Sequence, residues 1–167
     1  MEHQRTREFD GVLMTIRLLI ADDCAAMREN LKCFIRKYPD IEVIGEATDG
    51  EAAVELARKL SPDVVLMDIS MPKLNGIEAA AHILKDNAGV RVTVLSSHSN
   101  RGFVMTGLKA GISGYVLKTS IMDDLIPALR AAMANELFLS SEIAALVSGK
   151  SAQHPPKADR SVSGTHE

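Results

Sequence analysis

The residues with the clearest capacity for chemistry stand directly after short apolar runs. Three carboxylates, one hydroxyl and one amine follow four such runs: Asp22 and Asp23 after 16–21, Asp68 after 64–67, Ser96 after 90–95, and Lys118 after 114–117. If the runs are parallel strands, their carboxyl ends meet at one sheet edge, where open sheets of this kind bind ligands. A single aspartate there is usually a helix cap or a turn residue. Polar groups from four strands together predict a binding site.

Three carboxylates at one sheet edge favour a bound cation. Acids that lie close together repel one another, which raises their pKa values unless a positive charge joins them. Ligation by oxygen alone suits Mg²⁺, Mn²⁺ or Ca²⁺ better than zinc. Cys24 and Cys33 are too few and too close in sequence for a zinc site or a disulfide framework, which fits a reduced cytoplasmic setting.

The elements that must position these residues alternate along the chain. Apolar runs with few charges predict five strands, at 16–21, 41–47, 64–67, 90–95 and 114–117. Such runs are typical of strands buried on both faces, and hence of a parallel sheet. Helices are expected at about 27–35, 52–60, 76–85, 100–110 and 123–135. The prediction is an α/β fold, a doubly wound five-stranded parallel sheet with helices on both faces.

Proline in the last expected helix suggests where that helix begins. A helix tolerates proline only in its first turn, where no backbone N–H is needed. Because of Pro127, we expect Asp123 or Asp124 to be the N-terminal cap.

Composition separates the ends of the chain from its centre. Residues 1–14 are mostly polar and form an N-terminal extension, and 148–167 hold little apolar surface and are expected to be disordered. The 167 residues carry 22 acidic and 19 basic side chains, a net charge of −3, which argues against a domain devoted to binding nucleic-acid phosphates. No apolar run is long enough to span a membrane, and the N-terminus does not resemble a signal peptide.

Four motifs together resemble one known family. IADD, VVLMDISMPKLNG, VTVLSSHS and GYVLK occur in the order and spacing of the receiver domain of bacterial response regulators, the CheY-like fold. The resemblance covers about residues 15–136 and implies a flavodoxin-like sheet with strand order 2-1-3-4-5. It implies Mg²⁺ as the cation and a histidine kinase or phosphotransfer protein as the partner.

The resemblance also implies a role for each residue. Asp68 would be the phosphoacceptor. Asp23 would bind Mg²⁺ directly, Asp22 would bind it largely through water, and the backbone carbonyl of Ser70 would be a further ligand. Ser96 would supply the switch hydroxyl, and Lys118 would pair with a phosphoryl oxygen. Tyr115 would be the aromatic residue that moves inward.

The chain departs from the family pattern at the switch and after the lysine. Ser96 stands where threonine is commoner, which keeps the hydroxyl, and Ser97 stands where alanine is usual. Thr119 replaces a frequent proline after Lys118, so a cis bond there would cost several kcal/mol more than a prolyl one.

The final segment bears on the output of the protein. NELFLSSEIAALV, of which 137–147 is expected to be a short helical segment, resembles the stretch after the receiver in regulators with a LuxR-type helix-turn-helix. Two interpretations stay open: a receiver-only or truncated form of a LuxR-type transcriptional regulator, or a stand-alone phosphorelay or interaction receiver.

The remaining expectations concern partners and activity. We expect no DNA binding by this chain alone and no enzymatic activity beyond its own phosphorylation and slow dephosphorylation, and whether it forms a homodimer is open. A hydrolase with an aspartate nucleophile is disfavoured because Ser70 stands where a second acid would be needed. No Gly-x-Gly-x-x-Gly follows the first strand, which disfavours a dinucleotide-binding enzyme.

Overall fold

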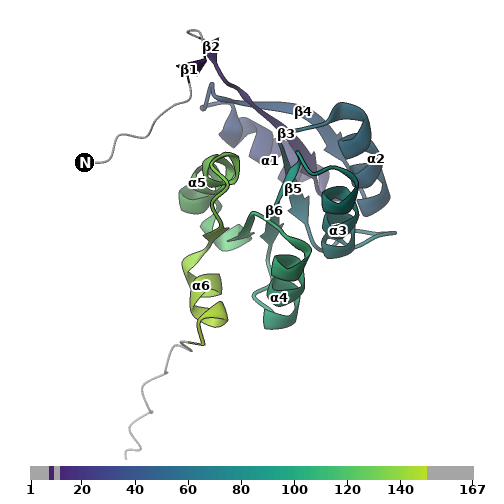
Figure 1. The fold of residues 1–167 in the computed structure, drawn as a ribbon, viewed down its shortest axis with the longest axis vertical. Coiled ribbons are helices and arrows are strands. Elements are labelled where there is room, and N and C mark those ends of the chain that lie inside the picture. The colour runs from purple at the N-terminus through teal and green to yellow at the C-terminus, as the bar shows by residue number, and fades with distance from the viewer. Residues whose placement is uncertain (1–7, 10–11, 150–167) are drawn as a thin grey trace, which may run out of the picture.

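A parallel sheet of six strands forms the centre of the computed structural model, which describes residues 8–9 and 12–149 (Figure 1). The strands lie in the order β4-β3-β5-β6-β7-β8. Their bounds are β3 Ile16–Ala21, β4 Ile41–Ala47, β5 Val64–Asp68, β6 Arg91–Ser96, β7 Gly114–Leu117 and β8 Phe138–Leu139. The first five keep the predicted order 2-1-3-4-5, so the doubly wound parallel fold is confirmed.

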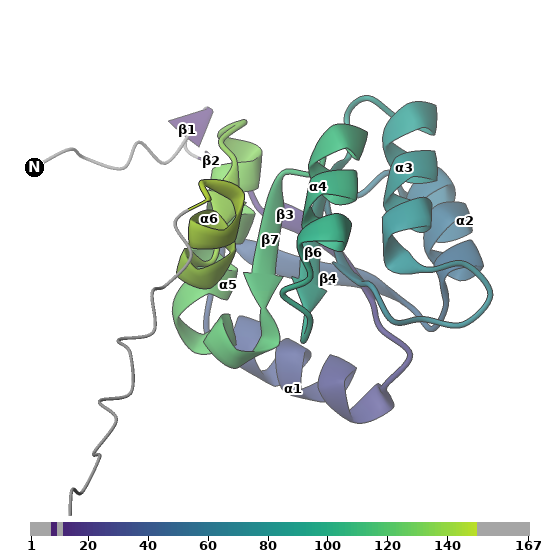
Figure 2. The ribbon, with the colours of Figure 1, turned by 90° about the horizontal axis from the view of Figure 1, so that it is seen from below.

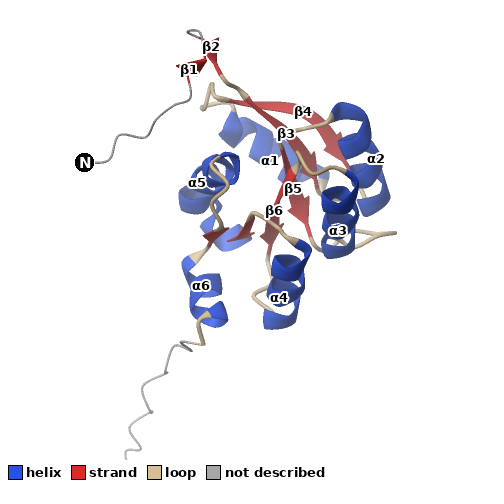
Figure 3. Cartoon of the chain, viewed as in Figure 1, coloured by secondary structure: helices blue, strands red, loops and turns tan. Residues whose placement is uncertain are grey.

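Helices cover both faces of this sheet (Figures 1–3). Their bounds are α1 Ala25–Ile35, α2 Gly50–Leu60, α3 Gly76–Asp86, α4 Arg101–Ala110, α5 Ile121–Met133 and α6 Ser141–Val147. Alternate strand residues feed two apolar clusters. One lies beneath α2, α3, α4 and α6, and the other lies beneath α1 and α5. Within β3, Leu19 belongs to the first cluster and Leu18 to the second. Burial on both faces explains why these strands carry few charges.

The predicted number of strands in the main sheet is wrong by one. Phe138–Leu139 forms β8, which pairs in parallel with β7 through Gly114↔Phe138 and Tyr115↔Leu139. Two residues are too few to show a periodic pattern, so only their tertiary pairing identifies them as a strand. The helix expected within 137–147 lies at Ser141–Val147.

The predicted start of the last helix is also wrong. A 3₁₀ turn, η1 at Lys118–Ser120, leads directly into α5, which begins at Ile121 rather than after a cap at Asp123 or Asp124. Pro127 therefore lies inside the helix. Interior proline costs about 3 kcal/mol, but α5 buries a continuous apolar face that offsets this cost: Leu125, Ile126, Ala128, Leu129 and Ala132. All peptide bonds of the described residues are trans, including that between Lys118 and Thr119.

The two ends of the chain are described only in part. Within the expected N-terminal extension, β1 (Glu8–Phe9) and β2 (Val12–Leu13) form an antiparallel pair separate from the main sheet. The expected disordered tail lies, from residue 150 onward, outside the described residues. No helix in the described part of the chain is both long and apolar enough to cross a membrane.

Candidate functional site

The carboxyl ends of four neighbouring strands bring the predicted residues together. Asp22 follows β3, Asp68 ends β5, Ser96 ends β6 and Lys118 follows β7. Strand β3 lies between β4 and β5, so the chain winds in opposite directions from it. Open parallel sheets bind ligands at such a topological switch point.

Asp22, Asp23 and Asp68 form a compact acidic cluster. Each offers a carboxylate oxygen, and these oxygens lie within 4.8 Å of one another. Asp22 is 2% exposed and Asp68 5% exposed, whereas Asp23 is exposed to solvent. The Nζ atom of Lys118 lies 3.4 Å from Asp22 Oδ2 and 3.4 Å from Asp68 Oδ1. The cluster of three carboxylates has one ammonium group beside two of its members, and an all-oxygen donor set with excess negative charge fits a hard divalent cation.

The start of α1 holds Asp22 in place. Its Oδ1 atom accepts a hydrogen bond from the Cys24 amide at 2.8 Å, and its backbone carbonyl accepts one from Arg28 Nη1 at 2.7 Å. The Asp22 amide in turn donates to the Ala47 carbonyl at the end of β4, 3.0 Å away. Because these bonds use one carboxylate oxygen and the backbone, Oδ2 is left to face Lys118 and Asp68.

Burial raises the pKa of the Asp68 carboxyl group above its ordinary value. The charge of Asp22 raises this pKa further, while the ammonium of Lys118 and the backbone N–H of Ser70 lower it. Few protein groups therefore stabilise the negative charge of the Asp68 carboxylate. An additional cation at the cluster would stabilise it.

A close backbone approach shapes the loop after Asp68. A Cβ atom added to Gly76 would lie 2.0 Å from the Asp68 carbonyl oxygen, so only glycine fits there. Gly76 is not among the glycines with positive φ. The residue of the loop with positive φ is Lys73, at 68°. Gly76 is required for space rather than for conformation, and its amide donates to the Ile69 carbonyl at 2.9 Å.

Ser96 and Tyr115 are joined through the backbone of His98. Ser96 Oγ accepts from the His98 amide at 3.0 Å, and the Tyr115 hydroxyl donates to the His98 carbonyl at 2.7 Å. Both Ser96 and Tyr115 are fully buried. Burial raises the pKa of Tyr115. In this conformation the Tyr115 ring already lies inside, so the inward movement expected from the sequence is not required to place it there.

Ser140 lies beyond the expected domain limit and is not among the predicted site residues, but it supports the end of β7. Its hydroxyl accepts from the amide of Leu117, the residue before Lys118, at 3.1 Å. Nothing in the local pattern indicates this contact, because the two residues are 23 positions apart.

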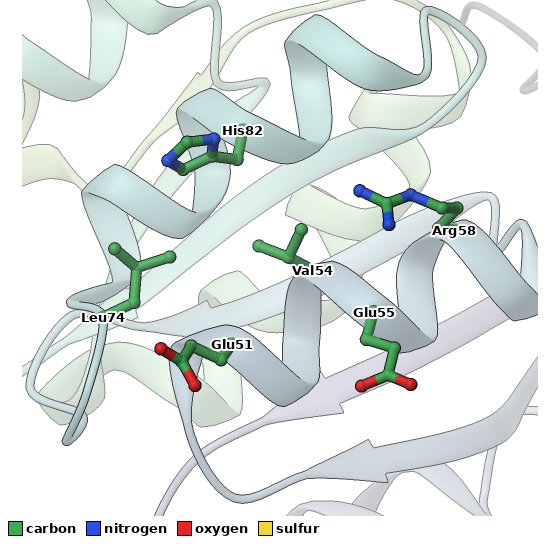
Figure 4. A pocket seen from close by; sticks show the side chains of 6 residues that line it. All are labelled: Glu51, Val54, Glu55, Arg58, Leu74 and His82. Carbon is green, nitrogen blue, oxygen red and sulfur yellow. The ribbon is translucent and has the colours of Figure 1, made fainter.

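A separate groove lies between α2 and α3 (Figure 4). None of the residues predicted for the site lines it. Its walls are formed by six residues: Glu51, Val54, Glu55, Arg58, Leu74 and His82.

Comparison with known proteins agrees with the fold and the site. Residues 18–130 match the family described as the response regulator receiver domain. The chain is 40% identical over 128 residues to the transcriptional regulatory protein DegU of Brevibacillus brevis, covering 77% of this chain and 54% of DegU. It is 42% identical over 132 residues to the transcriptional regulatory protein LiaR of Bacillus subtilis, covering 79% of this chain and 63% of LiaR.

A solved structure shows the same similarity. The two-component response regulator of the LuxR family from Aurantimonas sp. superposes with a TM-score of 0.78 at 33% identity, covering 81% of this chain and 97% of that chain. This chain belongs to the response regulator receiver domain family. Its relatives are LuxR-type response regulators, as the resemblance implied, and it spans only 54% of the length of DegU and 63% of the length of LiaR.

Proposed function

We propose that this chain is a phosphoacceptor receiver whose Asp68 takes a phosphoryl group from a histidine kinase or phosphotransfer protein in a Mg²⁺-dependent reaction. The single observation that carries the proposal is the position of Asp68. Its carboxylate is 5% exposed, lies within 4.8 Å of two further carboxylates and is 3.4 Å from the ammonium of Lys118.

The chemistry needs positioning and charge compensation rather than a general base. A carboxylate oxygen of Asp68 attacks the phosphorus of a phosphohistidine. The new P–O bond forms as the P–N bond breaks, and the imidazole leaves with the electron pair and is reprotonated from solvent. Lys118 neutralises a phosphoryl oxygen, and Ser96 donates its hydroxyl to another.

The acidic cluster would hold the metal. Asp23 and Asp68 would bind Mg²⁺ directly, Asp22 would bind it largely through water, and the Ser70 backbone carbonyl would supply a further oxygen. A bound Mg²⁺ offsets the negative charge of the phosphoryl oxygens and so favours transfer. The acids alone would repel an incoming phosphoryl group.

Phosphorylation by a small phosphodonor tests the proposal. Intact mass should show the gain of one phosphoryl group when Mg²⁺ is present, and no gain when the metal is chelated. Asp68→Asn should abolish the gain. Asp86→Asn is a matched control, because Asp86 is an exposed carboxylate at the end of α3 that pairs with Arg58. Undiminished labelling of the Asp68→Asn protein would refute the proposal.

We further propose that the chain acts as the receiver of a LuxR-type transcriptional regulator. The transcriptional regulatory proteins DegU and LiaR support this, because both extend well beyond the matched region. The alternative is a stand-alone phosphorelay or protein-interaction receiver. On either proposal this chain alone should not retain a promoter fragment in a sequence-specific manner at physiological salt, because its net charge of −3 offers little attraction for phosphates.

A further inference from the structure

Ser140 joins three elements through one buried hydroxyl. It lies between β8 and α6 and is 1% exposed. Its Oγ donates to Asp124 Oδ2 on α5 at 2.6 Å and accepts from the Leu117 amide at the end of β7 at 3.1 Å. A serine just before a helix usually caps it, but Ser140 makes no side-chain cap with α6. The hydroxyl is committed to α5 and β7 instead.

Two hydrogen bonds join Ser140 to the backbone of β7, and both lead to the candidate phosphorylation site. Leu117 immediately precedes Lys118, whose Nζ lies 3.4 Å from Asp22 and 3.4 Å from Asp68. The Ser140 amide donates to the Tyr115 carbonyl at 3.0 Å. The Tyr115 hydroxyl in turn contacts His98, which contacts Ser96. A movement of Lys118 therefore reaches Ser140 through the neighbouring Leu117 amide, which is hydrogen-bonded to the serine hydroxyl. A movement of Tyr115 reaches it through the hydrogen bond between the Tyr115 carbonyl and the Ser140 amide.

Helix α6 depends on the same junction for its position. Ile143 is fully buried in the cluster beneath α4, and Leu146 and Val147 pack against that cluster. Helix α6 contacts α4, β7 and β8, and Figure 2 shows it beside the outer edge of the sheet. Ser140 is the residue at which α6 leaves the sheet, so its two side-chain bonds fix the direction of the chain beyond.

We propose that Ser140 is a positioning residue that couples the docking of α6 to the position of Lys118. The inference rests on the proposed function, because the ligand that moves Lys118 is the phosphoryl group on Asp68. A buried hydroxyl that loses one partner keeps the full cost of its desolvation. When the Leu117 amide shifts, we therefore expect Ser140 to shift with it so that the hydrogen bond is kept. Coupling of this kind is reciprocal: the phosphoryl group changes the docking of α6, and undocking of α6 changes binding at Asp68 to the same extent.

Amide hydrogen exchange of the full chain tests this coupling, with beryllofluoride as a mimic of the phosphoryl group. In the wild-type protein, beryllofluoride should change exchange at residues 141–147 several-fold. Ser140→Ala should exchange about tenfold faster there without the mimic, because two buried hydrogen bonds are lost, and should no longer respond to it. Ser148→Ala is the matched control. Its hydroxyl donates to Ala145 at the exposed end of the same helix, and the variant should respond like the wild type.

Substitution of Asp124 tests the hydroxyl without removing it. Asp124→Asn keeps an oxygen that accepts from Ser140 and should keep the response, whereas Asp124→Ala should lose it. A wild-type response in Ser140→Ala, or no response of α6 in the wild type, would overturn the inference.

Fluorine NMR of the bound beryllofluoride separates the two proposals. If the adduct forms in every variant while α6 responds equally in all of them, only the coupling is refuted. If no adduct forms in any variant, the proposed function fails and the coupling fails with it.

Discussion

Replacing Gly76 with alanine should damage the candidate phosphorylation site from outside it. Gly76 contributes no side chain to the acidic cluster, but it lies against the backbone of Asp68 and Ile69. An added Cβ would lie 2.0 Å from the Asp68 carbonyl oxygen and 2.8 Å from the Ile69 Cα. Both neighbours are backbone atoms, so neither can rotate out of the way.

The size of the effect follows from these distances. Real Cβ contacts are not shorter than 3.0 Å, so the start of α3 and the end of β5 must separate by at least 1.0 Å, the difference between 3.0 and 2.0 Å. Overpacking of this kind costs about 1–3 kcal/mol, against a gain of up to about 1 kcal/mol for alanine over glycine in a helix. With that gain subtracted, we expect a net loss of up to about 2 kcal/mol. A misplacement of about 1 Å at a reacting group costs on the order of 100-fold in rate.

The assay pairs urea unfolding with the rate of phosphorylation by a small phosphodonor and Mg²⁺, read by intact mass. The control is Gly89→Ala, because a Cβ at Gly89 would meet only Asn87 Oδ1 at an ordinary 3.5 Å. This control should keep wild-type stability to within about 0.5 kcal/mol and a wild-type rate. If Gly76→Ala matched the wild type in both measurements, the close approach would not be what positions Asp68.

Three further predictions test the switch, the C-terminal helix and the surface charges. Ser96→Ala should still be phosphorylated on Asp68, but amide exchange at residues 97–117 should no longer respond to beryllofluoride; identical responses in both proteins would exclude the hydroxyl as the coupling group. Ile143→Ala removes a fully buried side chain and should raise amide exchange in α6 more than tenfold while β3 and β5 stay protected, since such truncations cost about 2–5 kcal/mol; unchanged exchange in α6 would contradict this. Hydrogen bonds from Lys32 and Arg28 lower the pKa of the Glu46 carboxyl group below its ordinary value of 4.5. The charged carboxylate therefore stabilises the folded protein above pH 4.5. This stabilisation is lost as the pH falls through the lower pKa that Glu46 has in the folded state. Glu46→Gln should therefore lose less than about 1 kcal/mol near neutral pH and converge with the wild type in acid, which urea unfolding at several pH values would show.

The regular part of the fold is predictable because burial dictates composition. Strands covered on both faces must be apolar throughout, and this marks β3, β5, β6 and β7 in the sequence. The expected helix at 76–85 matches α3 closely, because Asn75 caps it with its side chain, accepting from the Glu78 amide at 2.9 Å. The rule that proline lies in the first turn of a helix gives the wrong start for α5, because the packing of its buried face holds Pro127 in the helix interior. Tertiary packing there outweighs a rule that holds for isolated helices.

The grouping of the site residues could likewise be predicted, whereas the contacts that support them could not. Strand ends of a parallel sheet meet at one edge whatever the side chains are, so Asp22, Asp68 and Lys118 could be brought together from topology alone. The space requirement of Gly76 depends on the distance between β5 and α3, and no pattern along the chain encodes that distance. The sequence shows a glycine, and the structure supplies the reason for it.

Two supports, whose role the structure supplies, act on opposite ends of the same charge pair. Gly76 sets how closely α3 approaches the backbone of Asp68, and Ser140 holds the amide next to Lys118. If both supports act as proposed, the 3.4 Å separation between Asp68 and Lys118 depends on two elements that take no part in the chemistry. One of them, the β8–α6 segment, comes after β7 and α5 in the chain. If Gly76→Ala and Ser140→Ala act on this one distance, their effects on the phosphorylation rate should not add in the double variant, because residues that share a contact couple whereas distant ones do not. Strict additivity would show that the two supports act independently of one another.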